Sequence, residues 1–127
     1  MRNSLWSNSD MQLNTGQCLV DATLHIYWLC LLTDGNLVLY LDSAGSSTPL
    51  WDTKTANSGS PPYILYMQSD GNLVLYANAV PQWDTKTYKK GTAPYSLAVQ
   101  SDGNVVLYDS VNKALWDRLG YVSGVKQ

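Results

Sequence analysis

The sequence predicts an all-β fold, because one turn motif recurs along the chain and the composition suits strands and turns. The motif Asp-Gly-Asn-(Leu/Val)-Val-Leu-Tyr starts at Asp34, Asp70 and Asp102. Tyr, Trp, Val and Leu favour strands, Asp, Gly, Asn and Ser favour turns, and Glu and Phe are absent. The copies are 36 and then 32 residues apart, within the range of structural repeats. We therefore expect one domain over residues 1–127 with three internal repeats.

Each copy predicts a strand, a tight turn, a second strand, a loop and a third strand. The first strand lies just before the motif and includes a tyrosine at an equivalent place in each copy. These aligned segments are Tyr27–Asp34, Tyr63–Asp70 and Tyr95–Asp102. The third strand contains a Trp-Asp pair, which occurs at Trp51-Asp52, Trp83-Asp84 and Trp116-Asp117.

The register of the tight turn follows from the alternation of side chains along a strand. A two-residue turn would set polar Gln68 opposite apolar Leu73, whereas a three-residue loop sets Gln68 opposite Asn72. The longer loop, residues 69–71, also puts Gly71 at the left-handed position that such loops require. We therefore expect the three-residue loop in every copy.

With this register, one face of the three hairpins carries only aliphatic side chains and predicts the core. Burial of each large side chain stabilises the fold by about 1.5–3 kcal/mol relative to exposure. The tryptophans of the Trp-Asp pairs are expected to join this core around a pseudo-threefold axis. The aliphatic residues are Leu29, Leu31, Leu37, Leu39, Leu65, Met67, Leu73, Leu75, Leu97, Val99, Val105 and Leu107.

The opposite face of the second copy carries a row of Gln68, Asn72, Val74 and Tyr76, with Asp70 at the turn beside it. Amide and phenol groups both donate and accept hydrogen bonds, a carboxylate accepts, and Val offers an apolar patch. This set suits the adjacent hydroxyls and the C–H patch of a neutral sugar. It does not suit catalysis: no nucleophile–base pair is visible, and each motif holds one carboxylate rather than the pair that glycoside hydrolysis uses. We therefore expect a binding protein and not an enzyme.

Several other classes are disfavoured by the composition. The longest basic run is Lys89-Lys90, and no apolar run could cross a bilayer, which argues against nucleic-acid binding and membrane insertion. No His/Cys cluster suggests zinc, no calcium-loop spacing occurs, and His25 is expected at a turn or on the surface.

The N-terminus lacks a signal peptide, which fits a cytoplasmic protein or a secreted mature form. Cys18 and Cys30 are spaced to bridge a hairpin, and both a disulfide and free thiols fit the sequence.

The row also resembles a known signature. Gln-x-Asp-x-Asn-x-Val-x-Tyr, complete at Gln68–Tyr76 and Gln100–Tyr108, is similar to that of the bulb-type, monocot mannose-binding lectins. The resemblance extends over nearly the whole chain, including Leu5-Trp6 near the start and the Trp-x-Thr-x-Thr strands. It implies a β-prism II fold, in which three four-stranded antiparallel sheets pack around a shared core. It also implies metal-independent binding of D-mannose, mannosides and high-mannose glycans, with no cofactor.

The resemblance assigns a role to each residue of the row. In the family Asp and Asn hold the axial O2 hydroxyl, Gln holds O3, Tyr holds O4, and Val packs on the ring carbons. These roles fall on two complete sites in this chain, namely Gln68, Asp70, Asn72, Val74 and Tyr76, and Gln100, Asp102, Asn104, Val106 and Tyr108.

The first copy departs from this pattern. It keeps Asp34, Asn36, Val38 and Tyr40 but has Leu32 in place of the glutamine, and Leu cannot bond the O3 hydroxyl. An unpaired buried hydroxyl costs about 1–3 kcal/mol, so we expect this degenerate site to be silent.

Family resemblance also implies a homodimer that exchanges a C-terminal strand, here residues 115–120. The Trp-Asp-Arg-Leu of that strand departs from the Trp-Asp-Thr-Lys-Thr of the other copies. An alternative function is a protein-interaction or bacteriocin-like module of the same fold, and a storage or structural role with vestigial sites is a weaker one.

Overall fold

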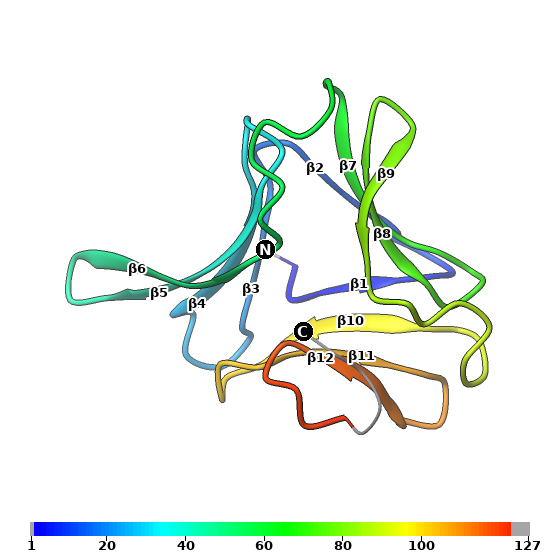
Figure 1. Cartoon of the computed structure of the whole chain (residues 1–127). Coiled ribbons are helices and arrows are strands. Elements are labelled where there is room, and N and C mark those ends of the chain that lie inside the picture. The colour runs from blue at the N-terminus through cyan, green and yellow to red at the C-terminus, as the bar shows by residue number, and fades with distance from the viewer. Residues whose placement is uncertain (1, 123–127) are drawn as a thin grey trace.

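Three four-stranded antiparallel sheets form a triangular prism in the computed structural model, which describes residues 2–122 (Figure 1). Met1 and residues 123–127, which belong to the expected domain, lie outside the described residues. The sheets enclose a common core, which makes this the predicted β-prism II fold. No helix able to span a membrane occurs between residues 2 and 122.

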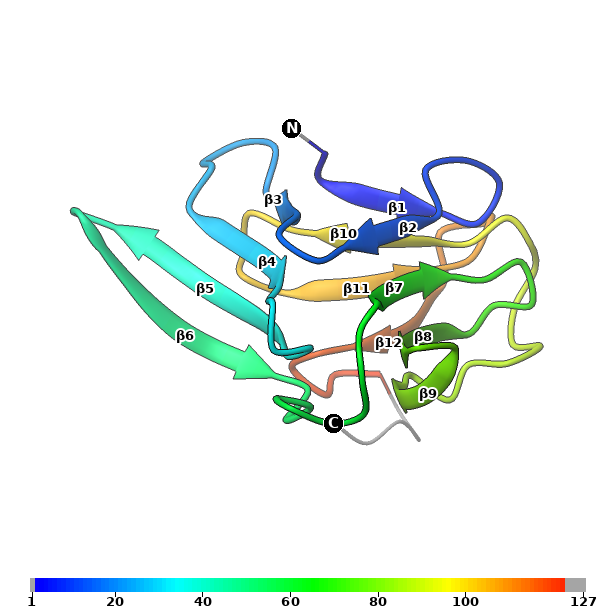
Figure 2. The same ribbon diagram turned by 90° about the horizontal axis from the view of Figure 1, so that it is seen from above.

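Each repeat supplies three consecutive strands of one sheet, and the N-terminal segment supplies the fourth strand of all three. The first sheet has the order β3 (Cys18–Val20), β4 (Tyr27–Leu31), β5 (Leu37–Ser43) and β6 (Ser46–Asp52). The second has the order β2 (Gln12–Asn14), β7 (Tyr63–Met67), β8 (Leu73–Ala77) and β9 (Val80–Asp84). The third has the order β1 (Ser4–Trp6), β10 (Ser96–Val99), β11 (Val105–Tyr108) and β12 (Ala114–Asp117). Residues 4–20 therefore visit every sheet in turn, as the views in Figures 1 and 2 show.

The predicted three-residue turn is confirmed. Met67 pairs with Leu73 and Tyr66 with Val74. Continuing this register by one residue places Gln68 opposite Asn72. The Gln68 backbone N–H donates to the Asn72 carbonyl at 3.0 Å. The first and third copies have the same register.

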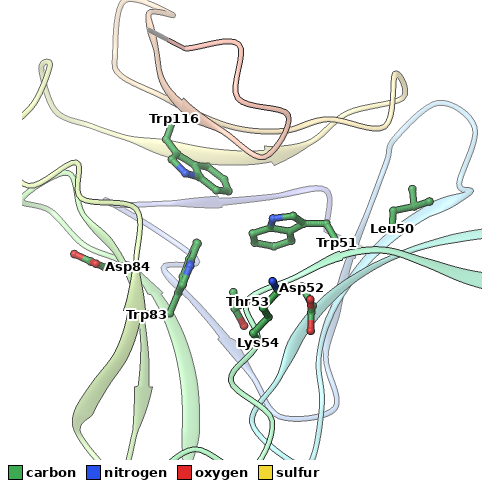
Figure 3. A pocket seen from close by; sticks show the side chains of 8 residues that line it. All are labelled: Leu50, Trp51, Asp52, Thr53, Lys54, Trp83, Asp84 and Trp116. Atoms are coloured by element: carbon green, nitrogen blue, oxygen red, sulfur yellow. The ribbon is translucent and has the colours of Figure 1, made fainter. Parts of the chain in front are cut away.

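The predicted core is confirmed as well. All twelve aliphatic residues are at most 2% exposed. One tryptophan from each repeat packs with the other two at ring-centroid distances of 5.7–5.9 Å, in edge-to-face geometry that suits aromatic pairs. Figure 3 shows Trp51, Trp83 and Trp116 turned toward one another. The three rings and five neighbouring residues line an opening of about 510 Å³.

The C-terminal strand is shorter than expected. It covers Ala114–Asp117 rather than residues 115–120, because Gly120 adopts a left-handed turn and its N–H donates to the Asp117 carbonyl. It pairs with β11 of the same chain.

The motif glycine of each repeat lies directly beneath the first tyrosine of the next repeat. A Cβ atom built on Gly71 would stand 2.9 Å from the Tyr95 ring and 3.1 Å from the Thr87 carbonyl oxygen. The pattern is cyclic, because the third repeat meets the first. The three pairs are Gly35 with Tyr63, Gly71 with Tyr95, and Gly103 with Tyr27.

Gly71→Ala is expected to destabilise the protein more than Gly45→Ala. Both glycines have positive φ, at 92° and 77°, but a Cβ on Gly45 meets no atom within 4 Å. The control therefore reports backbone strain of about 1–3 kcal/mol, and the Gly71 variant adds the clash with Tyr95. Urea unfolding midpoints check this. Equal losses in the two variants would show that the contact is unimportant.

The Asp21 carboxylate organises the loop between β3 and β4. It accepts backbone N–H bonds from Leu24, His25, Ile26 and Tyr27 at 2.7–3.0 Å, and the Ser101 hydroxyl donates to it at 3.0 Å. Burial acts to raise the pKa of Asp21, but these hydrogen bonds outweigh it and lower the pKa to about 2. His25 lies at this turn with a φ of 56°, as expected.

The pKa of Asp21 predicts a specific loss of stability in acid. Because the folded-state pKa lies below the ordinary value of 3.8, the carboxylate stabilises the fold fully above that value, and the contribution disappears as the pH falls toward 2. Asp21→Asn is therefore expected to be less stable at neutral pH and to lose less stability than the parent between pH 5 and pH 2. Denaturant melts across this range check it, and parallel curves would contradict it.

Candidate functional site

The polar row of the second sheet lies on its outward face, as predicted. The Gln68 amide Nε2 donates to the Tyr76 hydroxyl across the hairpin. Val74 lies between them on β8 and is 4% exposed, with Tyr66 and Asp84 opposite it on the two neighbouring strands. The amide, the phenol and the small apolar patch therefore form one continuous surface.

Asp70 is held by the turn itself. Its Oδ1 accepts the Asn72 backbone N–H at 2.9 Å, and the Gly71 N–H donates to the Gln68 carbonyl at 3.1 Å. With Oδ1 engaged, Asp70 still has its second carboxylate oxygen for a ligand.

The Asn72 side chain is fixed from both ends. Its Oδ1 accepts from the Thr87 backbone N–H at 3.2 Å and from the Thr85 hydroxyl at 3.3 Å. Its Nδ2 donates to Asp84 Oδ2 at 2.8 Å. One amide hydrogen is therefore taken by Asp84 and the other remains for a ligand.

Asp84 is a member of the site that the sequence reasoning missed. Each motif does contain a single carboxylate, but the fold brings in a second one from the neighbouring strand, because Asp84 stands opposite Val74 and accepts a bond from the motif asparagine. The signal was present in the Trp-Asp pair that recurs in every repeat. Asp52 and Asp117 make the equivalent bonds to Asn36 and Asn104, both at 2.9 Å.

The third sheet brings its five residues together in the same way. The Gln100 amide donates to the Tyr108 hydroxyl, Val106 is 4% exposed, and Asp102 Oδ1 accepts the Asn104 N–H at 2.9 Å. The carbonyl of Gly103 is bonded by the Arg118 guanidinium at 2.7 and 3.0 Å, where the second copy uses the Thr87 hydroxyl on Gly71.

Asp117 remains ionised despite being only 2% exposed. Burial acts to raise the pKa of its carboxyl, but the bonds from the Asn104 amide and the Val122 N–H prevail, and the pKa is lowered. Val122 and Tyr121 belong to the segment after β12 that lines one side of this site.

The first sheet has the same turn and amide hydrogen bonds as the other two sheets but lacks the glutamine of the polar row. Asp34 and Asn36 keep their turn and amide bonds, and Val38 and Tyr40 lie on the outward face. Leu32 stands where the other copies have a glutamine, so no amide reaches the Tyr40 hydroxyl from that position. A disulfide joins Cys18 to Cys30 next to Val38, which resolves the alternative left open by the sequence.

Each complete row borders a hollow, and the two hollows differ in size. Of the second row only Gln68 and Tyr76 line the hollow, whereas Gln100, Asn104, Val106 and Tyr108 line that of the third sheet. The hollow of the second sheet is about 420 Å³ and includes Ile64 and Tyr66. The hollow of the third sheet is about 530 Å³, and Ser96 and Ala98 occupy the positions of those two residues on β10. Within residues 2–122, no group of three or more His, Cys, Asp or Glu side chains gathers as a metal site would require.

Solved structures similar to this chain cover almost all of it. A monomeric monocot mannose-binding lectin from Gastrodia elata is 32% identical with a TM-score of 0.76, and the match covers 91% of this chain and 94% of that one. The chain belongs to the monocot, bulb-type mannose-binding lectin family. The snowdrop (Galanthus nivalis) mannose-specific agglutinin, solved with methyl-α-D-mannoside, is also 32% identical, with a TM-score of 0.71 and coverage of 96% of this chain and 99% of that chain.

A curated relative supports the same family over a shorter stretch. A mannose-specific lectin from Dendrobium findlayanum is 48% identical over 50 residues, which are 39% of this chain and 27% of that protein. No protein-family model matches the chain. As a member of a lectin family, this lectin is a binding protein and not an enzyme.

Proposed function

We propose that this lectin binds D-mannose and mannose-rich glycans, without a metal ion, at the second and third sheets, and that the first sheet is silent toward mannose. One observation carries the proposal: in two sheets a glutamine amide bonds the motif tyrosine across a buried valine, and in the first sheet Leu32 removes that amide. The mannoside complex of the snowdrop relative supports the choice of sugar.

The chemistry of the row fits an axial hydroxyl flanked by equatorial ones. The free oxygen of Asp70 accepts the O2 hydroxyl while the remaining Asn72 amide hydrogen donates to it. Gln68 then bonds O3 and Tyr76 bonds O4, with Val74 against the ring carbons. Bonds to the ionised carboxylate are the strongest of these, and both Asp70 and Asn72 are held in place before the sugar arrives.

Two sites on different sheets favour a multivalent target. Linking weak sites raises avidity by roughly 10²–10⁴ when both engage one ligand. A homodimer would double the sites and remains a prediction. In the single chain β12 pairs with β11, so strand exchange in such a dimer would replace this pairing by the same pairing with the partner subunit.

The proposal is tested by replacing the glutamine of each complete row with leucine, and the leucine of the first row with glutamine. Gln68→Leu and Gln100→Leu are each expected to remove one site from calorimetric titrations with methyl-α-D-mannoside, and the double variant is expected to lose detectable heat. Leu32→Gln is expected to add a third site, because the rest of the first row is in place. Unchanged stoichiometry in the single variants would refute the assignment. A glycan array with mannose competition would reveal a protein or other ligand instead.

Removing Asp84 tests its role as a positioning residue. In a Gln100→Leu background, which leaves only the second site, Asp84→Ala is expected to weaken mannoside binding about tenfold, because the Asn72 amide loses a charged partner. Asp52→Ala is the matched control, since Asp52 makes the same bond in the silent sheet. Equal affinities in the two variants, with both folded by circular dichroism, would show that Asp84 does not position Asn72.

A further inference from the structure

The first sheet carries a hollow on its outward face, at the positions where the second sheet has the hollow lined by Ile64, Tyr66 and Tyr76, but its lining is different. Its volume is about 240 Å³, and its lining is Trp28, Cys30, Tyr40, Asp42 and Ser47. Only Tyr40 belongs to the degenerate row. The other four residues have no counterparts of the same chemistry in the second and third sheets.

An extended hairpin builds one wall of this hollow. Strands β5 and β6 each span seven residues, whereas β8 and β9 each span five. The additional length brings Asp42 opposite Ser47, and the Ser47 hydroxyl donates to the Asp42 carboxylate at 3.5 Å. Figures 1 and 2 show this hairpin reaching well beyond the other two.

Trp28 provides an aromatic wall at a fixed position. It pairs with Tyr40 across the sheet, and its indole Nε1 donates to the His25 carbonyl at 3.2 Å. The ring is half-buried, so part of it faces the hollow. Ile64 and Ser96 occupy the equivalent positions in the other sheets, so the indole is particular to this one.

Strand β4, which carries Trp28, is also held in place two residues further along, at Cys30. The Cys18–Cys30 disulfide joins β3 to β4 directly beside the hollow. A wall of fixed aromatic and sulfur atoms loses little conformational entropy when a ligand covers it. The hollow therefore resembles a small ligand site with few, convergent polar groups rather than an ordinary sheet surface.

We propose that Trp28, Tyr40, Asp42 and Ser47 form a second kind of carbohydrate site, which takes a neutral pyranose with a flat C–H face. The sugar stacks on the indole, whose electron-rich face attracts the polarised C–H groups. Asp42 and Ser47 accept and donate bonds to its hydroxyls. The Asp42 carboxylate disfavours acidic sugars by repulsion. Because no glutamine and no clamp for an axial O2 hydroxyl takes part, β-linked glucosides and galactosides, whose O2 hydroxyl is equatorial, suit this site better than mannosides.

The experiment uses the Gln68→Leu/Gln100→Leu double variant, in which the proposed mannose sites are removed, and titrates it with methyl β-D-glucoside and lactose. Saturable binding of at least one of these probes, followed by ligand-observed NMR, is expected to persist in this variant and to resist competition by methyl-α-D-mannoside. Adding Trp28→Ala is expected to weaken it about tenfold, while Trp28→Phe retains a ring and loses less.

Controls separate this site from folding and from the mannose sites. Trp6→Ala removes another exposed indole, 43% exposed on β1 of the third sheet, and is expected to leave probe binding unchanged. Trp28→Ala is also expected to keep the circular dichroism spectrum and the urea unfolding midpoint of the parent, which shows that it folds. Absence of binding by both probes, or equal binding with and without Trp28, would overturn the proposal. Either result is independent of whether the other sheets bind mannose.

Discussion

The contact between a motif glycine and the tyrosine of the next repeat is the constraint on which this molecule depends. It closes a ring of three, since the third repeat meets the first through Gly103 and Tyr27. The tyrosine ring occupies the space that any Cβ would fill, so the turn and the neighbouring sheet fix each other's position. The asparagine and aspartate of the row flank that same glycine. The geometry of the binding surface is therefore set by the contact that joins the sheets.

Hydrogen bonds of buried threonines connect the glycine of this contact to the asparagine of the candidate site. The Thr85 and Thr87 hydroxyls bond each other at 2.7 Å, and Thr87 also bonds the Gly71 carbonyl at 2.6 Å. Both threonines contact the Asn72 side chain, one through its hydroxyl and the other through its backbone N–H. Buried polar networks of this kind are rigid when every member has a partner, and among the described residues no buried side-chain polar atom lacks one.

The third repeat shows how the network tolerates change. It lacks the Thr-Lys-Thr segment, yet the Gly103 carbonyl still finds two donors on the Arg118 guanidinium. Asn104 keeps its bond to Asp117 but turns its carbonyl oxygen toward the Val105 N–H. Each of these buried polar groups therefore keeps a hydrogen-bond partner, although the partner differs between repeats.

Much of the architecture could be predicted from the sequence because strands have a period of two. Parity alone placed Gln68 opposite Asn72 and sorted twelve aliphatic residues onto one face, and the structure confirms both. The three short N-terminal strands could not be assigned this way. Each is three residues long, too short to show alternation. In addition, β1 and β2 are positioned by β10 and β7, which are distant in sequence, whereas β3 pairs with the next strand, β4.

The site was predicted less completely for a similar reason. Motif residues lie within nine positions of one another, so their clustering was visible in the sequence. Asp84 joins Asn72 from the neighbouring strand, 12 positions away, and a β-bulge between Leu75 and Tyr76 shifts the register in between. Local spacing does not reveal such a contact. The recurrence of Trp-Asp is the trace that the sequence carries, and burial of the tryptophan is by itself enough to explain that recurrence.

Outward-facing rows can diverge without disturbing the fold, because the sheets contact one another through the core and the turns and not through these rows. Leu32 replaces a glutamine on the outward face while the turn bonds of Asp34 and Asn36 remain. The first sheet also carries an indole, a disulfide and a longer hairpin, all on the outward side or at the edge of the prism. It thus combines the same turn bonds as the other sheets with a different set of converging side chains. Because the fold does not depend on the outward row, one sheet can present a different chemistry from the others, and the proposal that this sheet binds a different sugar rests on that independence.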